Sequence, residues 1–297
     1  MKTKRIRGVT VIQNRSGWLF IGLAVILVAC FTLYPVVSSF LMSFQTGKGA
    51  VYTFNGLGNF KRLLTDTVFL QALKNTFIYF LFQVPIMTIL ALLIANILNS
   101  PKLKFRGLFR TAIFLPCVTS LVAYSVLFKS MFSINGLVNR ILMSLHIIGD
   151  PIPWLTNAFW AKVLIIIALT WRWTGYNVIF YLSALQQIDP SMYEAAELDG
   201  ANKTQQFFHI VIPMLMPVIL FTSVLSTNGT LQLFDESYNI TVGGPGNATL
   251  SLSHYIYNIL FKFTPNFGYA STVSYVIVFF VAILAFLQFR VAGDRNE

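Results

Sequence analysis

Long apolar stretches, separated by shorter polar ones, run along the whole chain. Six of them are long enough to cross a hydrocarbon layer about 30 Å thick as α-helices, which rise about 1.5 Å per residue. The expected spans are Trp18–Phe44, Phe69–Leu98, Leu108–Lys129, Ala158–Leu185, Ile210–Phe234 and Tyr269–Phe289. We therefore predict an all-α integral membrane protein with six transmembrane helices. It forms a single transmembrane domain over residues 1–297, with an N-terminal tail over about residues 1–17 and a core over about residues 18–292.

The first span has the pattern of an uncleaved helix. Leu27–Val28–Ala29–Cys30 resembles the cleavage box of a bacterial lipoprotein, which is the alternative. A lipoprotein turns polar after that cysteine, whereas here the apolar run continues past Cys30 to Leu41. We therefore expect this segment to stay in the protein as a membrane helix.

Composition narrows the class further. Hydrophobic residues make up 56% of the chain and charged residues 10%, against about 25% charged residues in an ordinary soluble domain. In a soluble protein, the net charge of +11 would suggest a nucleic-acid partner. Here the charges stand in short loops beside apolar segments, where they orient the protein and contact anionic head groups. We therefore expect a lipid bilayer around the chain and no nucleic acid as its partner.

Lysine and arginine gather in three segments of the chain. Because an even number of spans separates each segment from the next, all three fall on the same side of the membrane. They are Lys2, Lys4, Arg5, Arg7 and Arg15 before the first span, Lys102, Lys104, Arg106 and Arg110 around the second-to-third loop, and Arg290 and Arg295 after the last span. Cytoplasmic loops carry the excess of basic residues in membrane proteins. Both termini are therefore predicted to be cytoplasmic.

The sequence has no pattern that indicates a catalytic or metal centre. Cys30 and Cys117 lie inside apolar stretches, and His146, His209 and His254 lie far apart. Such cysteines and histidines are usually structural. The spans also contain almost no carboxylates, which an ion-coupled secondary transporter would use near the bilayer midplane. The chain is therefore predicted not to be an enzyme, with a secondary transporter kept as an alternative.

The loop between the fourth and fifth spans predicts a short helix. Asp189–Pro190 suits a helix N-cap followed by proline at the first helical position. Glu194 and Glu197 fall in the early turns, and Gly200 allows the chain to stop and turn. A short helix that lies in a partner's groove can carry force between two proteins.

This loop carries the resemblance to a known family. Glu-Ala-Ala, three residues, Gly, nine residues, Ile, one residue, Leu, Pro is the signature of permease subunits of type I ABC importers. Here Ile212 replaces the leucine, which is a conservative departure. The resemblance implies an ATPase-coupling loop made of Tyr193, Glu194, Ala195, Ala196, Asp199, Gly200, Ile210 and Pro213.

A second stretch is similar to the carbohydrate branch of that family, which includes the larger maltose permease subunit and shorter relatives for lactose, other oligosaccharides and glycerol phosphate. The segments that carry this similarity are Leu233–Tyr238, Thr241–Gly246, Tyr255–Tyr257 and Phe267–Ser271. The chain is thus expected to import a sugar, either a disaccharide or an oligosaccharide. An acidic sugar and glycerol phosphate remain open alternatives.

The resemblance also implies partners in a bacterial cytoplasmic membrane. They are a second homologous permease subunit, two ATPase subunits and an extracytoplasmic sugar-binding protein. The chain has no phosphate-binding loop of the Gly-x-x-x-x-Gly-Lys-Ser/Thr kind. ATP and Mg are therefore expected on the partner ATPase, and no cofactor is expected in this chain.

Two polar clusters inside the spans mark a candidate substrate pathway, because polar residues in a bilayer are costly. They lie in Thr170–Asn177 and Ser226–Gln232, and they supply the aromatic faces, amides and hydroxyls that bind sugars. Together, these clusters and the resemblance to the carbohydrate branch give the candidate substrate-pathway residues. They are Arg172, Trp173, Tyr176, Ser226, Asn228, Gly229, Thr230, Gln232 and Leu233. Arg172 either contacts an acidic sugar or phosphate, or pairs with a carboxylate of the partner permease. Small polar residues also join membrane helices to one another, which is the competing interpretation.

Overall fold

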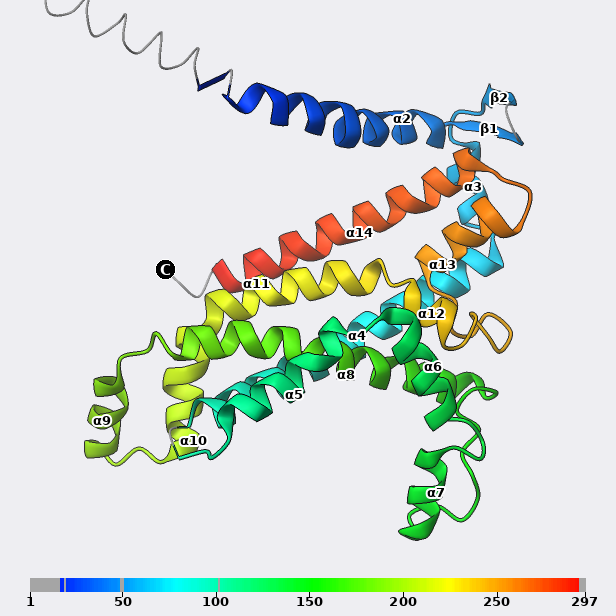
Figure 1. The fold of residues 1–297 in the computed structure, drawn as a ribbon. Helices are drawn as coiled ribbons and strands as arrows, with labels where there is room; N and C mark the ends of the chain where they lie inside the picture. Colours follow the sequence, from blue (N-terminus) through cyan, green and yellow to red (C-terminus); the bar gives the residue numbers. More distant parts are fainter. Residues whose placement is uncertain (1–16, 19, 49–50, 101, 294–297) are drawn as a thin grey trace, which may run out of the picture. The chain divides into compact units, whose positions relative to one another are not determined.

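The computed structural model describes residues 17–18, 20–48, 51–100 and 102–293, and its helices are drawn in Figure 1. The predicted basic tail before the first span, and Arg295, lie outside these residues. The chain divides into two units. One consists of Met1–Arg62 and Ile259–Tyr275, and the other of Leu63–Asn258 and Val276–Glu297.

Within the described residues, five helices are long and apolar enough to cross a membrane. They are Phe20–Ser43, Thr67–Asn99, Ala158–Leu185, Lys203–Asn239 and Phe267–Arg290. A sixth crossing results if α5 (Arg106–Val118) and α6 (Leu121–Met131) form one broken span. The prediction of a helical membrane protein is confirmed, because five of the six apolar runs fold as long helices and the third folds as the pair α5 and α6.

In the first unit, the long N-terminal helix contains a widened turn. A π-helical turn, η1 (Ala29–Leu33), leads into α2 (Tyr34–Ser43), whose first turn holds Pro35. Proline cannot donate the regular backbone bond, and a π turn beside it accommodates that gap. Phe20 and Phe31 are 88% and 76% exposed. This helix is continuous through the cysteine of the lipoprotein-like box.

A hairpin follows the N-terminal helix where the sequence indicated only a loop. β1 (Gln45–Lys48) and β2 (Val51–Phe54) pair antiparallel, with Gln45 opposite Phe54. The short helix α3 (Gly58–Leu63) comes next.

Side-chain contacts hold the end of α2 in the first unit. The carbonyl oxygen of Ser43 accepts hydrogen bonds from Asn59 Nδ2 at 2.9 Å and from Thr272 Oγ1 at 3.1 Å. The guanidinium of Arg62 lies 4.0 Å from the centre of the Tyr269 ring. The two hydrogen bonds satisfy the carbonyl of Ser43, which has no partner inside the helix.

The second unit is built around α4 (Thr67–Asn99), α8 (Ala158–Leu185) and α11 (Ile212–Leu231). Asp66 caps α4 by accepting two backbone hydrogen bonds of 3.0 Å each. Asn157 caps α8 in the same way, at 2.9 and 3.3 Å. Such side chains satisfy the free N–H groups of the first turn, which is why both helices begin at these residues. The unit also contains α7 (Leu137–Ser144), α9 (Pro190–Leu198), α10 (Lys203–Gln206), η2 (Phe207–Val211), α12 (Asp235–Asn239) and α13 (Leu252–Tyr257). The elements η3 (Asn258–Lys262) and α14 (Phe267–Gly293) each contain residues of both units.

The third predicted span, Leu108–Lys129, folds as two helices with a bend between them. Helices α5 and α6 meet at an angle of 100°. Thr119 and Ser120 between them are extended, with ψ angles of 147° and 132°. Pro116 removes a backbone donor, and its carbonyl oxygen accepts from Thr119 Oγ1 at 2.7 Å. The hydrophobic pattern alone does not distinguish a bent pair from one helix.

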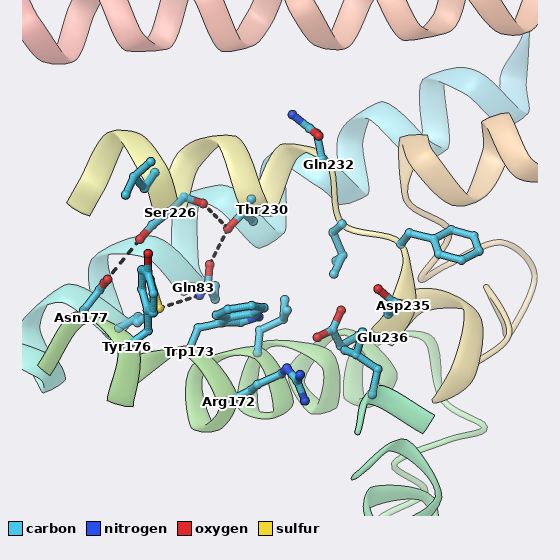
Figure 2. A pocket seen from close by; sticks show the side chains of 17 residues that line it. Gln83, Arg172, Trp173, Tyr176, Asn177, Ser226, Thr230, Gln232, Asp235 and Glu236 are labelled. Carbon is cyan, nitrogen blue, oxygen red and sulfur yellow. Dashed lines mark hydrogen bonds between the residues drawn. The ribbon is translucent and has the colours of Figure 1, made fainter. Parts of the chain in front are cut away.

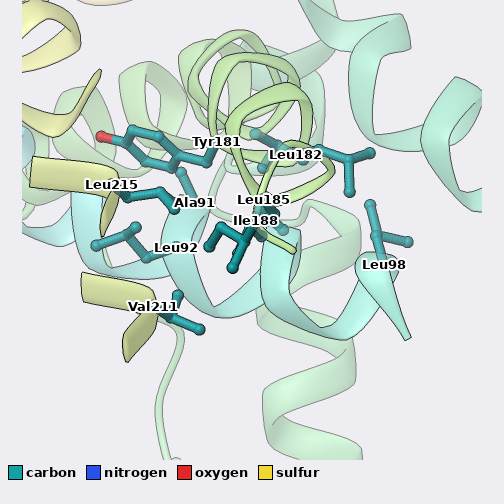
Figure 3. Packing of buried hydrophobic residues seen from close by; sticks show 11 residues of the cluster. Ala91, Leu92, Leu98, Tyr181, Leu182, Leu185, Ile188, Val211 and Leu215 are labelled. Atoms are coloured by element: carbon teal, nitrogen blue, oxygen red, sulfur yellow. The ribbon is translucent and has the colours of Figure 1, made fainter. Parts of the chain in front are cut away.

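An apolar core joins α4, α8 and α11 near the fourth-to-fifth loop (Figure 3). Its buried members are Ala91, Leu92, Ala95, Leu98, Val178, Tyr181, Leu182, Leu185, Ile188, Val211 and Leu215. Tyr181 also forms a hydrogen bond of 2.7 Å with the hydroxyl of Thr222 on α11. This bond is of the kind that joins membrane helices through small polar side chains.

The loop from α12 to α13 packs on the first turns of α4. Asn75 Nδ2 donates to the carbonyl oxygens of Asn247 and Leu250, both at 2.9 Å. Tyr79 OH donates to the carbonyl oxygen of Thr249 at 3.2 Å. These bonds hold the loop that follows α12 against α4.

Candidate functional site

A cavity of about 380 Å³ lies among α4, α8, α11 and α12 in the second unit (Figure 2). A volume of this order is typical of small-molecule sites. Its lining residues are Gln83, Met87, Leu121, Leu169, Arg172, Trp173, Tyr176, Asn177, Leu225, Ser226, Gly229, Thr230, Gln232, Leu233, Phe234, Asp235 and Glu236. The lining therefore combines aromatic rings, amides, hydroxyls, one guanidinium group and two carboxyl groups.

The structure brings most of the predicted pathway residues together at this cavity. Those that line it are Arg172, Trp173, Tyr176, Ser226, Gly229, Thr230, Gln232 and Leu233. Asn228 is the exception, and it instead accepts a hydrogen bond from Gln232 Nε2 at 2.6 Å. Lining positions on α11 recur at intervals of three and four residues, which is one face of a helix, and Asn228 lies off that face.

Hydrogen bonds between helices set the polar lining in place. Thr230 Oγ1 on α11 donates to Gln83 Oε1 on α4 at 2.7 Å. Asn177 Nδ2 on α8 donates to Ser226 Oγ on α11 at 3.3 Å. Gln83 and Thr230 are 2% and 5% exposed, so their bond is shielded from water. Each pair links one helix of the cavity wall to another.

A close helix crossing fixes Arg172 beside the cavity. Gly175 of α8 meets α5 so closely that an added Cβ would lie 2.0 Å from the carbonyl oxygen of Ile113. Cys117 Sγ of α5 donates to the carbonyl oxygen of Arg172 at 2.8 Å. Only a residue without a side chain allows backbones to approach this closely.

The side chain of Arg172 is buried without a full set of partners. It is 5% exposed, and neither Nε nor Nη1 has a hydrogen-bond partner. Its guanidinium carbon lies 4.9 Å from the ring centre of Tyr124 and 5.4 Å from that of Trp173. Such contacts with aromatic faces are favourable for a cation but leave its N–H donors unused.

Glu236 faces the same region from α12. It is 3% exposed and accepts a hydrogen bond from Tyr124 OH at 2.8 Å. Among the described residues Arg172, Asp235 and Glu236, no carboxylate oxygen lies within 4.0 Å of a guanidinium nitrogen. The cavity thus contains a separated cation and carboxylates.

Several lining residues were not among the predicted ones. Gln83, Asp235 and Glu236 are polar members of this group that lie outside both predicted clusters, and Asn177 lies in the cluster Thr170–Asn177 but was not a named candidate. Gln83 is a polar residue within a long apolar run, so the argument from costly polar residues would have identified it. Asp235 and Glu236 follow the fifth span in sequence, and only the fold shows that they return to the cavity.

The predicted coupling loop forms a short exposed helix, α9. Asp189 caps it through a hydrogen bond from the backbone N–H of Ser191 at 2.9 Å, which lowers the pKa of Asp189. At the other end, Gly200 has a φ of +83°. Its N–H donates to Glu197 O at 3.1 Å, and Ala201 N–H donates to Ala196 O at 2.8 Å. This is the glycine-dependent helix end that the loop sequence indicated.

The rest of the loop turns back towards α11. Asn202 and Gln205 form a reciprocal capping box at the start of α10. Lys203 Nζ forms an ion pair with Glu197 of α9, and the hydrogen bond from Lys203 lowers the pKa of Glu197. Ile210 lies in η2 and Pro213 in the first turn of α11. The loop is therefore held by its own caps and by one ion pair.

Hollows lie on both sides of α9. One of about 950 Å³ includes Tyr193 and Glu194 in its lining, and one of about 310 Å³ includes Ala196, Asp199 and Gly200. Partial burial raises the pKa of Tyr193. Glu194 and Ala195 themselves are exposed. The signature residues thus form a surface feature, unlike the residues of the cavity.

Neither site has the ligands of a metal centre. Among the described residues, no group of three or more His, Cys, Asp or Glu side chains could hold a metal ion. The described lining of the cavity supplies hydrogen-bonding groups, charged groups and aromatic surface.

Comparisons with known proteins define the family. The family described as "Binding-protein-dependent transport system inner membrane component" matches residues 68–293. The chain belongs to this family, as the signature of its fourth-to-fifth loop indicated, and is a membrane component of binding-protein-dependent transport.

Two similar relatives are named as permeases for sugars. The chain is 61% identical to the lactose transport system permease protein of Rhizobium radiobacter, over 95% of each chain. It is 35% identical to the arabinooligosaccharides transport system permease protein of Halalkalibacterium halodurans, over 88% of this chain and 83% of that one.

A solved structure has the same fold. It is the structure of a bacterial ABC transporter involved in the import of the acidic polysaccharide alginate. The TM-score is 0.80 at 23% identity, over 97% of this chain and 99% of the other. At this identity, the likeness shows the fold alone.

Proposed function

We propose that this chain is the permease subunit of an ABC importer that moves a disaccharide or oligosaccharide into the cell. The observation that carries the proposal is the cavity among α4, α8, α11 and α12. Aromatic rings, amides and hydroxyls line it within membrane helices, where polar groups are costly unless they serve a purpose. The names of the sugar permeases to which it is similar support this substrate class, and lactose is the first candidate.

The chain works with other subunits in this proposal. A second homologous permease completes the pathway, two ATPase subunits hold ATP and Mg, and an extracytoplasmic protein delivers the sugar. Helix α9 is the contact with one ATPase, because it is exposed, capped at both ends and bordered by hollows that a partner can fill. In this arrangement, Glu194 pairs with basic groups of the ATPase, and Ala195 and Ala196 allow close packing.

The proposal also fixes an orientation. The coupling helix must face the cytoplasm, where ATP is available. The basic residues around the second-to-third loop fall on that same side by the alternation of spans, in agreement with the excess of Lys and Arg in cytoplasmic loops. We therefore place both termini in the cytoplasm of a bacterial inner membrane.

Uptake by the reconstituted complex tests this function. The permease pair and the ATPases are placed in lipid vesicles with the binding protein outside and ATP inside, and entry of radiolabelled lactose is measured. Lactose and ATP hydrolysis are expected to depend on each other. Glu194→Ala combined with Gly200→Pro should abolish uptake, and Leu198→Ala, a change at an exposed residue of α9 outside the signature, serves as the control. Sugar entry by this chain alone, driven by an ion gradient, would contradict the proposal.

A further inference from the structure

The strongest unexplained feature of the molecule is the unpaired arginine in the cavity wall. Arg172 is only 5% exposed, yet two of its three guanidinium nitrogens have no hydrogen-bond partner. A buried charge with unused donors is unfavourable unless a ligand completes it. Nε and Nη1 are closed even to a water-sized probe, so a molecule in the cavity that Arg172 lines reaches them only when the side chain shifts.

The other charges of the cavity define what that molecule can be. Beside the guanidinium of Arg172, the lining has two carboxyl groups, those of Asp235 and Glu236, so its net charge is −1 when all three groups are ionised. In Figure 2 the guanidinium of Arg172 and the carboxylate of Glu236 lie at the same end of the cavity, beside the ring of Trp173. A ligand that reaches the arginine therefore also meets the carboxylates.

An anionic ligand suits this arrangement poorly. A uronic acid or a phosphate could pair with Arg172, but it would bring a like charge next to Glu236 and Asp235 in a site of low dielectric constant, which is unfavourable. A hydroxyl has no such conflict, because its oxygen accepts from the guanidinium while its hydrogen is donated to a carboxylate. Adjacent hydroxyls on a sugar ring can span a cation and an anion that do not touch each other.

We propose that Arg172 and Glu236 form a clamp that holds one ring of the transported sugar through its hydroxyls and selects uncharged sugars over acidic or phosphorylated ones. This inference rests on the proposed function and names the substrate class of the same cavity. Trp173 supplies an aromatic face beside the clamp, and Tyr124 holds Glu236 in place through its hydroxyl. The clamp opposes the acidic-sugar and glycerol-phosphate alternatives left open by the sequence.

Direct binding to the transporter tests the clamp without selection by the binding protein. The complex of this chain with its permease and ATPase partners is placed in lipid nanodiscs, and equilibrium binding of radiolabelled lactose and lactobionate is measured. Lactobionate is lactose whose glucose unit is oxidised to an open-chain carboxylate, and lactitol, which is open-chain but uncharged, is measured beside it as the control for the lost ring. The wild type should bind lactose at least about 10-fold more tightly than lactobionate.

Substitutions separate the clamp from a merely structural role. Arg172→Gln should weaken lactose binding about 10-fold to 100-fold. Glu236→Gln should narrow the preference for lactose over lactobionate, because the ionised lining then has no net charge. The double variant, Arg172→Gln with Glu236→Gln, should lose less lactose affinity than the two single variants lose together. It leaves neither charge buried without the other. Lys162→Gln removes a positive charge from the same helix outside the cavity lining and should change neither ligand's binding.

The outcomes distinguish the clamp from the function on which it rests. If the wild-type complex neither imports nor binds any sugar, the proposed function fails. If it imports lactose but binds lactose and lactobionate equally, or binds neither without the binding protein, the clamp is wrong and the function stands. An unchanged preference in Glu236→Gln would also overturn the clamp, even if Arg172→Gln fails to assemble.

Discussion

The cavity and the coupling loop place their polar residues in opposite surroundings. In the cavity, Gln83, Thr230 and Glu236 are buried, and their hydrogen bonds cross from one helix to another. In the coupling loop, Glu194 is exposed, and the bonds of the loop join residues a few positions apart. The loop is therefore a locally determined structure, whereas the cavity exists only when four helices are packed. Changes in the helix packing should thus affect the whole protein, and changes in the loop should affect only coupling.

The largest effect is expected where the helices cross. In Gly175→Ala, the new Cβ would lie 2.0 Å from the carbonyl oxygen of Ile113, a backbone atom that cannot rotate away. Overpacking of this kind costs about 1–3 kcal/mol and sometimes more. We expect a lower melting temperature of the purified permease and a loss of sugar binding. Gly107→Ala on α5 has nothing within 4 Å of its Cβ and is the matched control. Equal melting temperatures of the two variants would show that the crossing of α5 and α8 has room for a Cβ atom.

The next effect is confined to the loop. Gly200→Val forces a branched residue into a φ of +83°, which costs about 1–2 kcal/mol and disturbs the end of α9. If this strain destabilises the complex in which α9 is bound to the ATPase, sugar-stimulated ATP hydrolysis should fall about 10-fold. Lactose binding in nanodiscs should not change. Gly200→Asn is the control, because asparagine tolerates the left-handed region. Reduced lactose binding in Gly200→Val would contradict the separation of the two regions.

A smaller effect is expected within the cavity wall. Thr230→Val removes the donor to Gln83 and leaves Gln83 Oε1 buried without that bond, at a cost of about 1–3 kcal/mol. The melting temperature should fall and lactose binding should weaken. Thr230→Ser retains the hydroxyl and should restore most of both. If serine and valine behave alike, the hydrogen bond does not stabilise the wall.

The smallest effect is expected from the exposed ion pair of the loop. The hydrogen bond from Lys203 lowers the pKa of Glu197 below its ordinary value of 4.5, so any stabilisation by the pair is present at neutral pH and is lost as the pH falls below 4.5. Glu197→Gln should therefore reduce coupled hydrolysis only slightly at pH 7, and less at high salt. Stability measured by hydrogen exchange in the loop should differ between wild type and variant at pH 7 and converge in acid. A difference that grows in acid would contradict this sign.

The same contrast explains what could be predicted from the sequence. The coupling loop is specified by neighbours in the chain. Asp189 begins a helix, Gly200 ends it, and both act within a few residues, so the loop sequence indicated the helix and its limits. The six apolar runs are readable for a similar reason, because the length of an apolar run follows the thickness of the bilayer.

The cavity was predicted only in part. Trp173, Tyr176 and Ser226 were candidates because polar and aromatic residues stand out in an apolar span. Asn228 was a candidate on the same ground, but the helical turn directs it away from the cavity. Glu236 was not a candidate, since nothing near it in sequence shows that the loop after the fifth span returns to Arg172.

What the sequence by itself determined is the class of the protein, the approximate limits of its membrane helices and the helix of the coupling loop. All three depend on hydrophobicity or on bonds between near neighbours. The tertiary structure decided the bend between α5 and α6, the face of α11 that lines the cavity, and the placing of Arg172 among carboxylates without an ion pair. These features depend on contacts between residues far apart in the chain, such as the crossing of Gly175 with Ile113 and the bond from Tyr124 to Glu236. Hydrophobic periodicity carries no information about which distant residues meet, and the chemistry of the cavity depends on that alone.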